Sequence, residues 1–164
     1  MIDTEPTENA LAPVLISVYD RRKHLEMCIE ALKKNAEAKD TPLYIASDGW
    51  QHEGHRKAIE EVRAYIQTIE GFKEVNYRFH DKNMGMRDAS RNATQWVFSN
   101  HDCMIRMEDD IICSPHYLKF MNDALAAFEN ETRIYGICAH THPSFKKPQS
   151  YEYDIFMWQS FTPW

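Results

Sequence analysis

The sequence predicts an α/β fold in which an open, mainly parallel sheet lies between two layers of helices. Short apolar runs rich in β-branched residues alternate along the chain with longer segments whose apolar residues recur every three or four positions. Strands that alternate with amphipathic helices are typical of βαβ units, which form three-layer α/β/α domains. The length of 164 residues is that of one domain. We expect residues 1–12 to form a flexible polar arm and residues 13–140 to form this domain.

The first half of the domain contains two predicted βα units. Residues 14–19 form an apolar run typical of a strand that is covered on both faces. From residue 25 to residue 36, apolar side chains follow the spacing of an amphipathic helix. Residues 43–46 predict a second strand, and the apolar stripe over 59–69 predicts a second helix with Gly71 as its C-cap.

The second half continues this alternation. Residues 75–79 predict a third strand, 88–98 a third helix and 103–107 a fourth strand in the middle of the sheet. A capping hydroxyl and a proline at the first helical position predict that a fourth helix begins at Ser114-Pro115. Residues 134–137 are a candidate fifth strand.

Composition excludes several classes of protein. Hydrophobic residues make up 43% and charged residues 27%, which argues against a disordered, collagenous or membrane-embedded chain. The net charge of −6 argues against a nucleic-acid partner. No apolar run has transmembrane length, and residues 1–13 show no secretory signal. Cys28, Cys103, Cys113 and Cys138 form no CxxC pair. We expect reduced thiols in a cytoplasmic protein that can associate peripherally with a membrane.

Ligands of parallel sheets bind at the carboxyl ends of the strands. The residues that follow the four predicted strands there are Asp20-Arg21, Asp48-Gly49, His80 to Gly85 and Glu108-Asp109-Asp110. The acidic triplet is the strongest signal, because three adjacent carboxylates repel one another unless a cation neutralises them. Arg106 is the only basic residue nearby in the sequence. A hard divalent cation would suit one or two of these carboxylates together with diphosphate oxygens. The alternative is a solvated acidic turn.

An extended chain at the triplet would direct Glu108 and Asp110 to one side and Asp109 to the other. Asp48 could accept a hydrogen bond from a ligand N–H group, although Asp-Gly is also an ordinary turn. Arg21 could bind a phosphate or a base, although an arginine at a helix start is often only solvated. The sequence has no Walker or GxGxxG motif, and its histidines lack the HExxH spacing of catalytic zinc sites.

Taken in order, these segments resemble the nucleotide-binding half of GT-A glycosyltransferases. The resemblance is closest to family-2-type transferases and to the N-acetylglucosaminyltransferase I group, whose DxD motif takes the form Glu-Asp-Asp. It covers about residues 13–140. The matching segments are residues 14–21, 45–49, 83–92 and 107–110.

This resemblance implies a nucleoside-diphosphate sugar as donor, most often a UDP-sugar, bound with Mn²⁺ or Mg²⁺. Asp48 would contact the uracil, Arg21 the base or a phosphate, and Asp109 the ribose or the donor sugar. Asp110 would hold the metal, with Glu108 as a second candidate ligand. The remaining candidates for the nucleotide-sugar pocket are Tyr19, Arg87 and Asn92.

The resemblance also implies an inverting transfer to an acceptor hydroxyl, which needs a carboxylate base downstream of the metal motif. The chain continues only a short way past Asp110, so we expect residues 141–164 to begin an acceptor-side segment that is cut short. The base would then lie beyond Trp164, with Asp154 as a weak candidate, and the chain would transfer sugar poorly. Alternatives are a noncatalytic nucleotide-sugar-binding module and a phosphoryl-transfer enzyme. The second alternative is disfavoured because Asp20 has no second aspartate two residues on.

Overall fold

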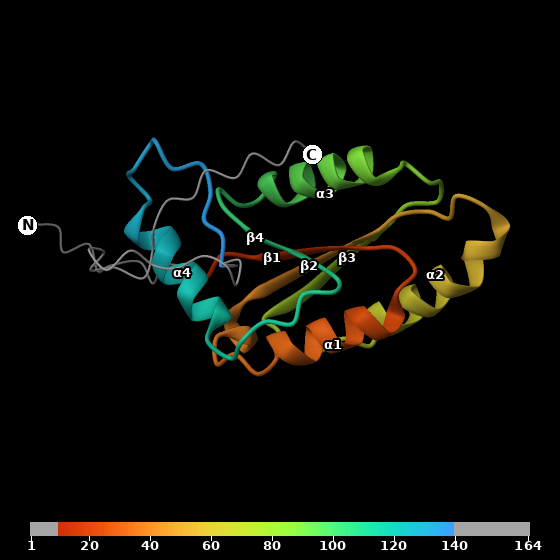
Figure 1. Cartoon of the computed structure of the whole chain (residues 1–164), viewed down its shortest axis with the longest axis horizontal. Helices are drawn as coiled ribbons and strands as arrows, with labels where there is room; N and C mark the ends of the chain where they lie inside the picture. Colours follow the sequence, from red (N-terminus) through yellow and green to blue (C-terminus); the bar gives the residue numbers. More distant parts are fainter. Residues whose placement is uncertain (1–9, 140–164) are drawn as a thin grey trace, which may run out of the picture.

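The computed structural model of the protein describes residues 10–139. In this part of the chain, four parallel strands form one sheet in the order β3-β2-β1-β4. Helices cover both faces of the sheet (Figure 1). The predicted α/β fold with a parallel sheet is therefore confirmed. The elements in chain order are β1 (Val14–Val18), α1 (Arg22–Leu32), a 3₁₀ turn (Ala38–Asp40), β2 (Pro42–Ser47), α2 (Glu53–Ile66), β3 (Glu74–Phe79), α3 (Met86–Phe98), β4 (Ile105–Glu108) and α4 (Tyr117–Ala127).

The register of the sheet brings the ends of all four strands to one edge. Val18 at the end of β1 lies opposite Ser47 at the end of β2, and Ser47 lies opposite Phe79 at the end of β3. On the other side of β1, Ser17 lies opposite Glu108, the last residue of β4. The segments that the sequence predicts to carry the chemistry therefore start from neighbouring points on the carboxyl edge.

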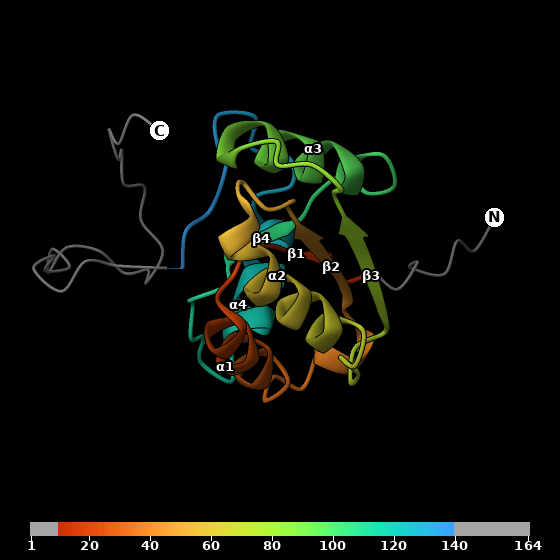
Figure 2. The same ribbon diagram turned by 90° about the vertical axis from the view of Figure 1, so that its right-hand side faces the viewer.

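Alternation along the strands divides the core into two parts. Val14, Ile16 and Val18 of β1 face the main core, which α1, α2 and α4 cover. Leu15 faces the opposite side, where it packs with Val97 of α3 in a smaller core. Figure 2 shows this division, with α3 on one side of the sheet and α1, α2 and α4 on the other.

Two predicted helix ends are wrong. Helix α1 ends at Leu32, which leaves Ala36 outside it and exposed. Helix α2 ends at Ile66, so Gly71 is not its C-cap. Both the amide and the hydroxyl of Thr68 donate to the carbonyl of Tyr65, which closes the last turn of α2 early. Gly71 instead adopts φ = 92° in the turn that leads to β3.

The fourth helix begins at Tyr117, two residues after Pro115, and its N-cap residue makes no side-chain capping bond. The Ser114 hydroxyl accepts a hydrogen bond from the amide of His116 instead, at 3.3 Å. The cap comes from elsewhere in the fold: the side chain of Asn35 accepts a hydrogen bond from the amide of Leu118 at 2.9 Å. The buried side-chain amide of Asn35, which lies just after α1, thus replaces the predicted local cap.

The candidate fifth strand is also wrong. Within the described range, residues 134–137 pair with no strand, and the side chain of Tyr135 is fully exposed. Strand β4 likewise differs from prediction, because it has one strand neighbour and lies at the edge of the described sheet.

None of the helices described for residues 10–139 has the length and apolar character that crossing a membrane requires.

Candidate functional site

Arg21 joins the ends of β1 and β4 at the carboxyl edge. Its guanidinium donates from Nε and Nη2 to the two carboxylate oxygens of Asp109, the Nε contact being 3.3 Å. A third donor, Nη1, reaches Asp110 Oδ2 at 3.0 Å. One guanidinium therefore pairs with two carboxylates of the acidic triplet, and this three-residue cluster keeps one net negative charge.

The two carboxylates differ in their exposure. The side chain of Asp109 is 4% exposed, whereas those of Asp110 and Arg21 are 38% and 45% exposed. A buried carboxylate needs a partner because burial penalises its charged form. The hydrogen bond to Asp109 is accordingly the main reason that the pKa of Arg21 is raised. Asp109 therefore anchors the Arg21 fork, and Asp110 presents its carboxylate to the outer side of this pair.

Exposure alternates along the triplet, with Glu108 and Asp110 exposed and Asp109 buried. The chain is not extended as the prediction assumed, because β4 ends at Glu108 and a turn follows it. The positive charge that pairs with the triplet does not come from the basic residue nearest to it in the sequence. Arg106, beside the triplet in sequence, donates to the Ser90 hydroxyl of α3 at 2.8 Å. Arg21 lies far away in the sequence, and it reaches the triplet because β1 and β4 are neighbours in the sheet.

The chemistry of the acidic residues allows one kind of metal site. Among the described residues, no group of three or more histidine, cysteine, aspartate or glutamate side chains could hold an ion. Asp110, however, pairs with Arg21 through one of its two oxygens and is partly exposed. Mg²⁺ and similar ions are often held by one or two carboxylates, with phosphate oxygens and water completing the coordination. Asp110 fits that arrangement, with Glu108 exposed beside it.

Asp48 follows β2 and organises the loop before α3. Its Oδ1 accepts from the amides of Gly49 and Met84 at 2.9 and 3.0 Å. Its Oδ2 accepts from the side chain of Asn83 and the amide of Gly85, both at 3.1 Å. The residue is 8% exposed. Both carboxylate oxygens are thus engaged by the protein's own donors, and Asp48 fixes the position of residues 83–85.

Gly49 allows this loop to approach β2. A Cβ atom at this position would lie 2.4 Å from the carbonyl carbon of Lys82 and 2.7 Å from the amide nitrogen of Asn83. These are backbone atoms, which cannot rotate away. The Asp-Gly pair that the sequence suggested as an ordinary turn is therefore a docking point for the segment that leads into α3.

Arg63 of α2 was not predicted as a site residue. Its guanidinium donates to the backbone carbonyls of Asp48 at 3.1 Å and His80 at 2.7 Å, and to the Ser47 hydroxyl at 3.2 Å. It also lies over the ring of Phe79, 5.0 Å from its centroid. Burial lowers the pKa of Arg63, with the charges of Asp81 and Asp48 opposing that shift. This side chain thus links the residue that follows β2 to the residue that follows β3.

Tyr19 performs a similar task at the end of β1. Its hydroxyl lies 2.7 Å from Nδ1 of His55 and accepts a hydrogen bond from the amide of Gln51 at 3.0 Å. Because this oxygen accepts from the amide, its own proton is available for the imidazole. Tyr19 therefore holds the loop between β2 and α2, and it contacts the protein rather than standing free at the edge.

The structure does not bring Arg87 or Asn92 to the acidic triplet. The Asn92 side chain accepts a hydrogen bond from Nη1 of Arg78 at 3.1 Å, on the face of the sheet that α3 covers. Arg87 is exposed in the first turn of α3. Asp154 and residues 141–164 lie outside the described residues.

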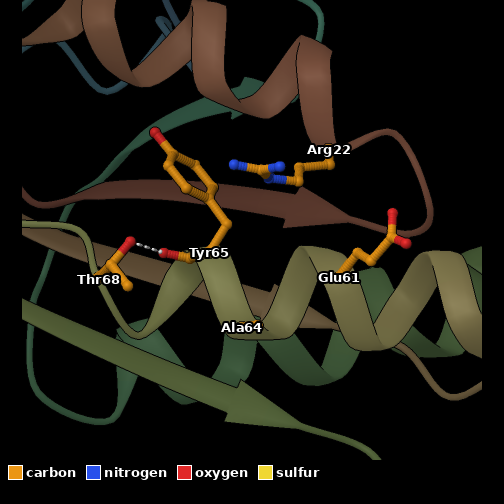
Figure 3. Close-up of a pocket in the computed structure, with 5 residues that line it drawn as sticks. All are labelled: Arg22, Glu61, Ala64, Tyr65 and Thr68. Carbon is orange, nitrogen blue, oxygen red and sulfur yellow. Dashed lines mark hydrogen bonds between the residues drawn. The ribbon is translucent and has the colours of Figure 1, made fainter.

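A separate hollow lies between α1 and α2, with a volume of about 310 Å³ (Figure 3). Arg22 enters it from α1, and the Tyr65 ring projects from α2 with the guanidinium 5.5 Å from its centroid. Glu61, Ala64 and Thr68 complete the lining. None of the residues predicted for a nucleotide or a metal lines this hollow.

No protein-family model matches the sequence, and no curated protein matches it significantly. The resemblance to GT-A glycosyltransferases therefore depends on the sequence motifs alone.

Proposed function

We propose that the carboxyl edge of the sheet binds the diphosphate of a nucleoside-diphosphate sugar, with a UDP-sugar favoured, and that the protein is a GT-A-type glycosyltransferase. The observation that carries this proposal is the contact of Arg21 with Asp109 and Asp110. It places a partly exposed guanidinium and a partly exposed carboxylate side by side, at the edge where parallel sheets bind nucleotides.

The two charges suit the two halves of a cation-diphosphate complex. A guanidinium offers paired N–H donors that match phosphate oxygens, and Arg21 keeps donor capacity beyond its bonds to Asp109. A Mn²⁺ or Mg²⁺ ion held by Asp110, with Glu108 as the second candidate, would stabilise the charge that develops on the diphosphate leaving group. Asp109 holds the arginine in place.

The segment over β2 would form the side of the site that receives the nucleoside. Asp48 fixes the amides of Met84 and Gly85 in position, and Arg63 donates a hydrogen bond to the backbone carbonyl of Asp48. A nucleobase that binds here would contact a loop whose conformation these hydrogen bonds fix. We propose that the uracil lies against this Asp48-organised loop, with Tyr19 holding the adjoining segment.

In the transfer, the bond between the anomeric carbon and the diphosphate oxygen breaks while the acceptor oxygen bonds to that carbon and loses its proton to a base. The diphosphate leaves carrying the electron pair. Inversion follows from attack on the opposite face. In this proposal Arg21 would bind the departing phosphate throughout the step.

Calorimetric titration with UDP-, GDP- and dTDP-sugars, each with and without Mn²⁺, tests the proposal. We expect UDP-sugars to bind, and Mn²⁺ to strengthen their binding in the wild-type protein but not in Asp110→Asn. A matched control is Glu26→Gln, which removes one negative charge from an exposed position on α1. Binding that is unchanged in Asp110→Asn, or the absence of any nucleotide binding, would refute the proposed site.

A further inference from the structure

Tyr19 connects the end of β1 to the loop between β2 and α2 through two different partners. Its hydroxyl oxygen accepts a hydrogen bond from the amide of Gln51 at 3.0 Å and lies 2.7 Å from Nδ1 of His55. The Tyr19 and His55 rings meet edge to face, with their centroids 5.5 Å apart. We call these three residues the Tyr19 bridge. It joins the loop and the first turn of α2 to the end of β1.

The directions of these two hydrogen bonds depend on the charge of His55. Because the Tyr19 oxygen already accepts from an amide, its own proton goes to Nδ1, which must be unprotonated to accept it. Neutral His55 then carries its proton on Nε2. In a protonated imidazole both ring nitrogens are donors. The Tyr19 oxygen would then face two donors, the Gln51 amide and Nδ1–H of His55, while its own proton lost its acceptor. The Tyr19 bridge therefore requires neutral His55.

A second imidazole lies against His55. The centroid of the His52 ring, just before α2, is 3.7 Å from that of His55, and two protonated rings in this contact would repel each other. Two carboxylates of α2 are engaged elsewhere, because Glu53 and Glu60 bind Arg56 at 3.2 and 2.7 Å. Protonation would therefore disturb the stacked rings as well as the Tyr19 bridge. Other charged groups on the adjoining segments are Asp20 after β1, and Asp81 and Lys82 in the loop that contacts Gly49.

We propose that the Tyr19 bridge is a pH-sensitive attachment of the loop between β2 and α2. Histidine changes its charge between about pH 5 and 8. When His55 is neutral, Tyr19 holds both Gln51 and His55. When His55 gains a proton, its Nδ1–H displaces the Gln51 amide from the Tyr19 oxygen, and the loop is released from β1 at this point. Acidification thus loosens the segment that leads from the carboxyl edge into α2, whatever that edge binds.

Nitrogen NMR of the histidine rings and hydrogen exchange of backbone amides test the proposal on the full chain. At about pH 7.5 we expect neutral His55 to carry its proton on Nε2. Between about pH 7.5 and about pH 5, the protection of the Gln51 amide, corrected for the intrinsic effect of pH on exchange, should fall about fivefold, the scale of one hydrogen bond. The His101 amide should keep its protection, because its acceptor is the Val97 carbonyl, although the His101 ring pairs with Tyr44 at 3.0 Å. A proton on Nδ1 of neutral His55, or equal changes at Gln51 and His101, would overturn the inference.

Three variants separate the Tyr19 bridge from a general effect of charge. In His55→Gln, which cannot gain a proton, the protection of Gln51 should not change with pH. In Tyr19→Phe, which lacks the shared acceptor, it should be low at both pH values. His52→Gln is the matched control, because it removes the neighbouring imidazole and leaves the Tyr19 bridge in place, so the fall should remain.

A fall in protection that persists in His55→Gln or Tyr19→Phe, or that disappears in His52→Gln, would overturn the role of His55. Thermal unfolding curves check that each variant is folded. If Tyr19→Phe does not fold, the comparison of His55→Gln with His52→Gln decides the question.

Discussion

The substitution Asp48→Asn tests whether this residue anchors the loop before α3. The wild-type carboxylate accepts hydrogen bonds from the amides of Gly49, Met84 and Gly85 and from the side chain of Asn83. An asparagine keeps one oxygen and places an NH₂ group where the other oxygen stood. That group would face N–H donors, so at least two donors would lose their acceptor.

The expected loss follows from these contacts. A buried donor left without an acceptor costs about 1–3 kcal/mol, and the lower half of this range applies because the loop is partly exposed. For two donors we expect Asp48→Asn to lower the free energy of unfolding by about 2–4 kcal/mol. Asp102→Asn, the same substitution at an exposed position, should change it by less than about 0.5 kcal/mol.

Urea denaturation measures the free energy of unfolding, and amide hydrogen exchange locates the change. The amides of Met84 and Gly85 should exchange faster in Asp48→Asn than in the wild-type protein, while core amides keep their relative protection. Two results together would refute the reasoning: equal stability of Asp48→Asn and Asp102→Asn, and unchanged exchange at Met84 and Gly85.

Three further predictions concern the surroundings of the site. Gly49→Ala should displace the loop before α3 at Lys82 and Asn83 and lower the free energy of unfolding by more than about 2 kcal/mol. Gly54→Ala, whose Cβ would meet only a side chain at 3.4 Å, should be neutral or stabilising by urea denaturation. Arg63→Met should lower stability by about 2–4 kcal/mol and Arg63→Lys by less, because lysine keeps the charge but not the fork; equal losses would contradict the hydrogen-bonding role. Burial raises the pKa of Tyr65 and of Tyr117 to about 12, so stability should be intact below pH 10 and fall as the pH rises from 10 to 12. Ultraviolet titration should detect both late-ionising phenols, and titration of all tyrosines near pH 10 would contradict this assignment.

The sheet and its helices could be predicted because their signal is local. The run from Val14 to Val18 and the stripe of Leu25, Cys28 and Ile29 are buried as their spacing indicates. Helix ends were less predictable, since the cap of α4 comes from Asn35, a residue distant in the sequence. The sequence around Ser114 gives no indication that Asn35 accepts a hydrogen bond from the amide of Leu118.

The position of the candidate site was predictable from the sequence, but the contacts between its side chains were not. A parallel topology was enough to expect Asp48 and the acidic triplet at one edge. The pairing of Arg21 with Asp109 needed one more fact, that β1 lies beside β4. Arg63 carries no local signal at all, because its role comes from a long side chain that reaches across the ends of two strands.

Paramagnetic broadening of backbone amide signals by Mn²⁺ in the presence of UDP tests the central claim most directly, because it shows where the cation-diphosphate complex lies. We predict the strongest broadening at Arg21, Asp109 and Asp110. The amides of Thr68 and Gly71, at the far end of α2 and beyond it, should keep their intensity. Broadening centred on the hollow between α1 and α2, or spread evenly over the protein, would contradict the assignment of the carboxyl edge as the nucleotide site.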